Sequence, residues 1–311
     1  MELFEKQVDG FIEYLTVLKR SPDTIRSYHS SIESFISFLQ TERIYDLKET
    51  DPGVIGKYRE ELMEKKAGGA LSLETIHLRL RGLKRFFEYL TKTTQLLCDP
   101  TETMIMPKLG KRLPKNILTK DELTRIMAQA DISKPMGIRD RAMLELLYST
   151  GVRRSECSRL TIRDIDYEGG YARITGGKGG RDRIQPLGTH ACRWMKEYLL
   201  KVRPKLLERR KGDTRYETLF LTRSGRRMPV GCAGKVIEKY ARLAGIKGHV
   251  SPHSFRRAFA THMLEEGAHP LYIQRLLGHT TGQILNRYIR LLAVDLKAEH
   301  TRTHPRERDG R

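Results

Sequence analysis

The sequence predicts a mainly α protein of two domains, with a small β-hairpin or sheet in the second domain. Over residues 1–91, apolar residues recur at the three- and four-residue spacing of amphipathic helices. Residues 92–116 break that spacing with three prolines. Helical spacing then resumes, and two short extended runs (171–175 and 181–187) flank the glycine-rich sequence GGKGG, as in a hairpin. The second domain is therefore predicted to be α+β.

The first domain is predicted to be a bundle of four helices. Ser21, Asp51 and Ser72 stand where the N-caps of the second, third and fourth helices are expected, and the first two directly precede a proline. The helices would bury their apolar stripes against one another. We expect this helical domain over residues 1–91.

A basic, proline-containing linker is predicted over residues 92–116, because its prolines and its KLGKRLPK stretch show no helical period. The second domain, residues 117–311, then begins at Thr119, which forms a capping-box pattern with Glu122. Further helices are expected to follow, the first of them ending at Gly151, together with a short strand over 219–222.

The charge of the chain favours a polyanionic partner. The formal net charge is +20, from 58 lysines and arginines against 38 acidic residues. Such an excess favours nucleic acid over a membrane surface, although it also fits a generally basic protein. The four cysteines show no C-x-x-C pairing, no apolar run approaches membrane-spanning length, and the N-terminus resembles no signal peptide. We therefore expect reduced thiols and a cytoplasmic, nucleoid-associated protein with no membrane partner.

Residues 253–288 contain a set of side chains suited to phosphoryl transfer. His253 and Arg256 lie three apart in a helical pattern, which places them on one helix face. His279 ends the next helical segment, and Tyr288 lies on a third. Alone, Tyr288 would be an ordinary core tyrosine, since apolar residues flank it at helical spacing. Together with Arg153 these groups suit attack by a tyrosine on a phosphodiester.

Each of these groups has an expected role. Arg153 and Arg256 would hold the non-bridging phosphate oxygens, since a guanidinium stays protonated and can bind two oxygens. His253 would assist removal of the phenolic proton from the nucleophile Tyr288, and His279 would hydrogen-bond the phosphate. Lys178, at the hairpin tip, would protonate the departing 5′-oxygen. No cluster of carboxylates has metal-ligand spacing in residues 253–288, so we expect neither metal nor cofactor.

Two of these assignments have plain structural alternatives. Arg153 could be a surface arginine that pairs with Glu156, and from its own position this reading has equal weight. Lys178 at a glycine-rich tip could simply be solvated. The hairpin does not match a phosphate-binding P-loop, because no G-K-[ST] follows and strands flank it.

The chain resembles the tyrosine site-specific recombinases of the phage integrase family, and most of all the Xer type. The motifs that carry the resemblance are TGVRRSEC (150–157), the GGKGG hairpin (176–180), HSFR (253–256), LGH (277–279), a tyrosine nine residues after that histidine, and THPRE (303–307). The resemblance implies a two-domain, C-shaped DNA clamp with a core-binding domain at 1–91 and a catalytic domain at 117–311. It implies the catalytic set Arg153, Lys178, His253, Arg256, His279 and Tyr288, with Glu156 as a supporting acidic residue.

The function that the resemblance implies is cutting and rejoining of duplex DNA through a 3′-phosphotyrosine intermediate, without metal or ATP. The expected partners are a specific DNA site and, at synapsis, a homo-tetramer or a hetero-tetramer with a second recombinase. Chromosome or plasmid dimer resolution is the expected role, and a mobile-element integrase or excisionase of the same family is the alternative. A type IB topoisomerase-like enzyme and a non-catalytic DNA-binding protein are further alternatives.

Overall fold

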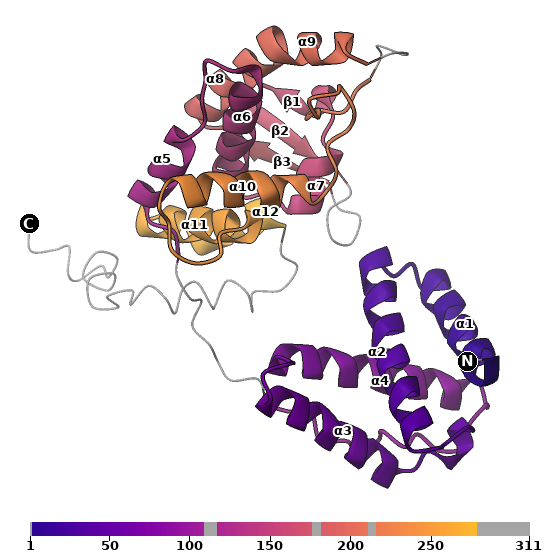
Figure 1. The fold of residues 1–311 in the computed structure, drawn as a ribbon. Helices are drawn as coiled ribbons and strands as arrows, with labels where there is room; N and C mark the ends of the chain where they lie inside the picture. Colours follow the sequence, from indigo (N-terminus) through magenta and orange to yellow (C-terminus); the bar gives the residue numbers. More distant parts are fainter. Residues whose placement is uncertain (1, 109–116, 176–181, 211–215, 279–311) are drawn as a thin grey trace, which may run out of the picture. The chain divides into compact units, whose positions relative to one another are not determined.

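The computed structural model describes residues 2–108, 117–175, 182–210 and 216–278 (Figure 1). The chain divides into two compact units, Met1–Lys111 and Arg112–Arg311. No helix of the described residues is long and apolar enough to cross a membrane.

The described part of the N-terminal unit, residues 2–108, contains four α-helices and one 3-10 turn. Their bounds are α1 Glu2–Val17, α2 Pro22–Thr41, the 3-10 turn Leu47–Glu49, α3 Pro52–Ala67 and α4 Leu73–Lys92. The predicted caps are confirmed: side chains of Ser21, Asp51 and Ser72 each accept a backbone N–H from the third residue of the following turn. Helices α2 and α4 pack against each other, and rings such as Phe35, Tyr58 and Phe87 are fully buried between the helices.

Where the structure describes it, the C-terminal unit is mostly helical and contains one small antiparallel sheet. The helices are α5 Lys120–Ala128, α6 Pro135–Thr150, α7 Arg154–Arg159, the 3-10 turn Ile162–Asp164, α8 Thr189–Glu197, a π-helical turn Tyr198–Val202, α9 Arg203–Glu208, α10 Cys232–Leu243, α11 Pro252–Glu265 and α12 Pro270–Leu277. The strands are β1 Ile165–Asp166, β2 Tyr171–Ile174 and β3 Arg183–Pro186, in the order β1-β2-β3. A mainly α fold with a small sheet is thus confirmed.

Helix α6 lies at the centre of this unit. It packs against α8, α11 and β3, and most of its residues are buried (Figure 1). Because α6 is covered on several sides, its apolar residues do not form a single stripe. The last turn of α6, the start of α7, β3 and the end of α12 lie close together. Arg153 lies at this place, and Arg256 reaches it from α11.

Two details differ from the sequence-based expectation. Strand β1 pairs with β2 through Ile165–Ala172 and makes the predicted hairpin a three-stranded sheet. The segment 219–222 is no strand; a single isolated bridge, Leu221 with Arg227, forms there. The Tyr198 hydroxyl, which donates to the Leu219 carbonyl and accepts the Leu221 N–H, holds this segment instead.

Candidate active site

The turn at Gly151 directs the chain from α6 into the site. Gly151 has φ 58°, the left-handed conformation that glycine adopts without strain. A Cβ at this position would lie 2.6 Å from a ring carbon of Phe259 on α11. Glycine therefore permits both the turn and the close packing of α11, and Arg153 follows two residues later as the N-cap of α7.

Glu156 fixes Arg153 in two ways. Its Oε2 accepts the backbone N–H of Arg153 at 2.8 Å, and its Oε1 accepts Nη1 of the Arg153 guanidinium, also at 2.8 Å. Glu156 is 2% exposed, whereas the Arg153 side chain keeps 25% of its surface exposed. The pairing that the sequence left open as an alternative is therefore present, and it leaves the guanidinium partly accessible.

Arg183, which the sequence reasoning did not select, binds the same carboxylate. Its Nη1 and Nη2 donate to Oε1 and Oε2 of Glu156 at 3.0 and 2.8 Å, and its Nε donates to the carbonyl oxygen of Leu276 at 2.8 Å. One signal in the sequence could have found it. Strand alternation turns Ile184 outward and places Arg183 and Gln185 on the inner face, where two polar side chains are unusual.

The carboxylate of Glu156 is held in its charged form. Burial alone would raise its pKa, but the hydrogen bonds and charge of Arg183 and the hydrogen bonds of Arg153 outweigh burial and lower the pKa to about 2. A charged, buried carboxylate with two guanidinium partners is a rigid centre, since both arginines are held by charge-assisted hydrogen bonds.

Arg256 on α11 is buried and joins the ends of two other helices. Its Nη1 donates to the carbonyl oxygen of Gly151 and its Nη2 to that of Leu277, each at 2.6 Å. Nη2 of Arg153 approaches the carbonyl oxygen of Gly278 at 3.4 Å. Arg153 and Arg256, from α7 and α11, therefore meet at the same turn after α12.

His253 lies one helical turn before Arg256, on the first turn of α11, and has an exposed face. The pKa of its imidazole is lowered, first by the partial burial of the ring and then by the positive charges of Arg257, Arg256 and Arg153. The neutral ring is thus favoured at pH 7, and a neutral imidazole can accept a proton or a hydrogen bond.

Lys178, His279 and Tyr288 lie outside the described residues. Strands β2 and β3 flank the segment that contains Lys178, and α12 ends at Gly278, directly before His279. Their roles stay predictions. Among the residues that the structure describes, no group of three or more histidines, cysteines and acidic residues could hold a metal ion, and a metal-free mechanism likewise stays a prediction.

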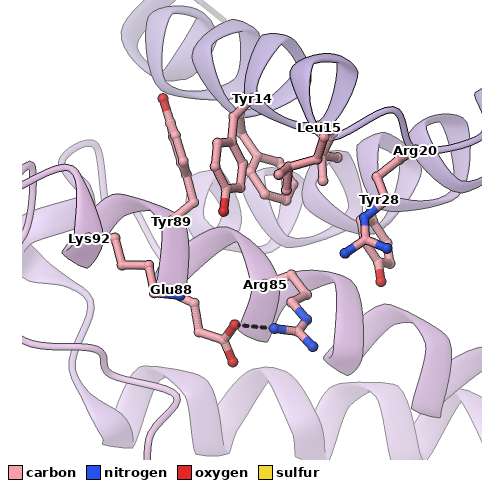
Figure 2. Close-up of a pocket in the computed structure, with 10 residues that line it drawn as sticks. Tyr14, Leu15, Arg20, Tyr28, Arg85, Glu88, Tyr89 and Lys92 are labelled. Atoms are coloured by element: carbon pink, nitrogen blue, oxygen red, sulfur yellow. Dashed lines mark hydrogen bonds and ion pairs between the residues drawn. The ribbon is translucent and has the colours of Figure 1, made fainter.

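A separate hollow lies in the N-terminal unit between α1, α2 and α4 (Figure 2). Tyr14, Tyr28 and Tyr89 line it, and Arg85 pairs with Glu88 at 2.6 Å beside it. Its volume is about 70 Å³. Ligand pockets usually measure roughly 300–1,000 Å³, so this hollow is too small for most ligands.

Comparison with known proteins places the chain in a family. The "Phage integrase family" profile matches residues 116–293, and "Phage integrase, N-terminal SAM-like domain" matches residues 8–94. The tyrosine recombinase XerC 2 of Ralstonia nicotianae is 36% identical over 96% of this chain and 86% of its own length. The tyrosine recombinase XerD of Listeria innocua is 33% identical over 96% of this chain and 98% of its own.

Solved structures show the same fold. XerA recombinase matches 97% of this chain and 99% of its own, with 28% identity and a TM-score of 0.52. A lambda integrase fragment, solved as a dimer bound to a core site, matches 91% of this chain and 94% of its own length, with 17% identity and a TM-score of 0.71. The fold is that of the tyrosine recombinases, which are DNA strand-transfer enzymes. The chain belongs to the phage integrase family and carries out site-specific tyrosine recombination.

Proposed function

We propose that Tyr288 cuts the DNA and that Arg153 and Arg256 hold the phosphate during attack. The phenolic oxygen forms a bond to phosphorus, the bond from phosphorus to the 5′-oxygen breaks, and a 3′-phosphotyrosine results. His253 assists removal of the phenolic proton, and Lys178 gives a proton to the departing 5′-oxygen. A 5′-hydroxyl of the partner strand then attacks the phosphotyrosine and reverses the chemistry, so no ATP is consumed.

The observation that carries this assignment is the meeting of Arg153 and Arg256 at the turn Leu277–Gly278. In phosphoryl transfer, negative charge is spread over the non-bridging oxygens, and fixed cations stabilise it. Two guanidiniums held by a buried carboxylate and by backbone carbonyls are pre-organised for that task. His279 follows this turn directly in the chain, so it is expected to reach the same phosphate.

The substrate we propose is a specific duplex DNA site bound by both domains, with residues 1–91 as the core-binding domain. Synapsis would join four protomers, either of this chain alone or with a second recombinase. Lambda integrase, which shares the fold, has been solved as a tetramer bound to a Holliday junction. The Xer-named relatives support chromosome or plasmid dimer resolution, in the cytoplasm at the nucleoid. Mapping the bound site in the genome separates this role from mobile-element integration.

A nicked suicide duplex tests the chemistry, because loss of a short 5′-hydroxyl fragment traps the covalent intermediate. The wild-type protein should form the adduct, also in excess EDTA, and Tyr288→Phe should bind the same DNA without forming it. Tyr272→Phe, which removes an exposed hydroxyl from α12, is the matched control and should react like wild type. An adduct that persists in Tyr288→Phe would assign the nucleophile to another residue.

A further inference from the structure

Arg183 has a position that connects three parts of the site. It is the first residue of β3 and pairs with Ile174 of β2, at the end of the sheet that leads toward Lys178. Its side chain turns inward and is only 11% exposed. Its backbone therefore belongs to the hairpin, while its guanidinium reaches Glu156 of α7 and the carbonyl oxygen of Leu276 on α12.

The sharing of Glu156 determines what Arg153 can do. Glu156 receives four hydrogen bonds, two from the Arg183 guanidinium, one from the Arg153 guanidinium and one from the Arg153 backbone. Because Arg183 forms the bidentate pair, Arg153 uses only Nη1 on the carboxylate. Without Arg183, the buried charge would have Arg153 as its main partner, and a bidentate Arg153–Glu156 pair would draw that guanidinium away from the phosphate.

A second effect acts at the end of α12. Nε of Arg183 and the side-chain amide of Gln185 both donate to the carbonyl oxygen of Leu276, and Gln185 also donates to the carbonyl oxygen of Thr150 at 2.9 Å. The inner face of β3 thus ties the last turn of α6 to the last turn of α12. Gly278 follows, and a Cβ there would lie 3.4 Å from Nη1 of Arg183.

We infer that Arg183 is a positioning residue for strand cleavage: it occupies the carboxylate of Glu156 so that Arg153 stays available to the scissile phosphate. It also fixes the last turn of α12 relative to β3. This inference rests on the proposed phosphate-binding role of Arg153. Lysine cannot replace Arg183 here, since a single ammonium cannot bind both carboxylate oxygens and Leu276 in one plane.

The test uses Arg183→Lys and Arg183→Met in the full-length protein. Thermal unfolding and DNA affinity are measured first, and then the single-turnover rate of adduct formation on the nicked duplex at saturating DNA, well below the unfolding temperature. We expect Arg183→Lys to bind DNA within a few-fold of wild type but to cleave on the order of 10–100-fold more slowly, as a small displacement of a catalytic group does. Arg183→Met should be slower still.

Two control variants separate positioning from general effects. Arg173→Met removes an arginine from β2 whose side chain is 61% exposed and lies 3.4 Å from Asp164, so it should change stability little and the cleavage rate not at all. Arg203→Met removes a buried arginine that binds the carbonyl oxygens of Thr218 and Leu219, far from Glu156 in sequence and on another element. It should lower the unfolding temperature while the cleavage rate of the folded protein stays normal.

A double-mutant cycle with Glu156→Gln identifies the route of the effect. If Arg183 acts through the carboxylate, Arg183→Met should slow Glu156→Gln much less than it slows wild type. If Arg183→Met slows Glu156→Gln by the same factor as it slows wild type, the inference is contradicted. It is also contradicted if Arg183→Lys cleaves saturating DNA at a rate within twofold of the wild-type rate. If the wild-type protein itself formed no adduct, the proposed function would fail instead, so the two failures are distinguishable.

Discussion

The guanidinium of Arg256 donates a hydrogen bond from Nη1 to the carbonyl oxygen of Gly151, at 2.6 Å, between residues 105 positions apart in the chain. The acceptor, the carbonyl oxygen of Gly151, lies only two residues before Arg153 in the chain. Placement of one phosphate-binding arginine is thereby linked to the backbone that places the other. The link depends on the left-handed turn at Gly151, where α6 ends.

Gly151→Ala should therefore be strongly destabilising. The alanine would have to adopt φ near 58°, and its Cβ would overlap the ring of Phe259, which lies 2.6 Å away. We expect a loss of about 1–3 kcal/mol of folding free energy, together with slower cleavage. Gly231→Ala is the matched control in the same unit, since φ there is −73° and a Cβ would meet nothing within 4 Å. Chemical denaturation of both variants checks this. Equal free energies of unfolding for Gly151→Ala and Gly231→Ala would show that the position of Gly151 does not require glycine.

Arg256→Lys should separate binding from catalysis. An ammonium cannot reach the carbonyl oxygens of both Gly151 and Leu277 and also face the phosphate. DNA affinity, which is spread over many phosphate contacts, should stay within a few-fold of wild type. The single-turnover cleavage rate should fall by roughly 10²–10³, the usual effect of removing one transition-state donor. Arg257→Lys, one position along α11, should lower the single-turnover cleavage rate only a few-fold. A large loss of affinity in Arg256→Lys would indicate a ground-state binding role.

The protonation of His253 gives a pH-dependent prediction. In the DNA-free protein its NMR titration midpoint should lie below 6.5, because burial and the nearby arginines disfavour the charged ring. Between the lowered midpoint and 6.5 the unfolded chain binds more protons than the folded one. His253 therefore contributes most stability above pH 6.5 and loses that contribution as the pH falls toward the folded-state pKa. Arg257→Gln should raise the midpoint. An unchanged midpoint would show that Arg257 does not act on the ring.

Much of the fold follows from local signals in the sequence. The N-caps at Ser21, Asp51 and Ser72, the capping box at Thr119 and the C-terminal glycine at Gly151 are readable because each satisfies backbone groups within a few residues. Strand β1 was missed because it has only two residues and no periodicity of its own. The segment 219–222 looks like a strand by composition, but its hydrogen bonds go to the Tyr198 hydroxyl and to scattered backbone groups such as the Leu160 carbonyl, not to one neighbouring strand.

The site was only partly predictable for a related reason. Arg153, His253 and Arg256 were selected from spacing and motif, and the structure places the two arginines at one turn. Arg183 was missed because its role depends on Glu156 of α7, 27 residues away, and on Leu276 of α12. Strand alternation indicates that Arg183 faces inward, but no local spacing encodes its contact with Glu156. Lys178, His279 and Tyr288 lie outside the described residues, so their roles rest on the resemblance and on chemistry.

The general acid is the group for which an experiment matters most. Lys178 lies in the segment between β2 and β3, and β3 begins at Arg183, which is fixed to Glu156 and α12. Beside Arg153 at a bound phosphate, the Lys178 ammonium would lie near a like charge, which favours release of its proton. Lys178→Ala should slow cleavage of normal DNA by a factor on the order of 100 to 10,000, the usual contribution of a general acid.

Sulfur in place of the bridging 5′-oxygen at the scissile phosphate provides the decisive comparison, because a thiolate leaves without needing a proton. On that substrate Lys178→Ala should recover most of the wild-type cleavage rate. Arg256→Ala should stay slow, since the non-bridging oxygens still need their guanidinium. Arg183→Lys should also stay slow, because its defect lies in the placement of Arg153. If sulfur restores neither Lys178→Ala nor Arg256→Ala, Lys178 positions the DNA, and His253 becomes the next candidate for the acid.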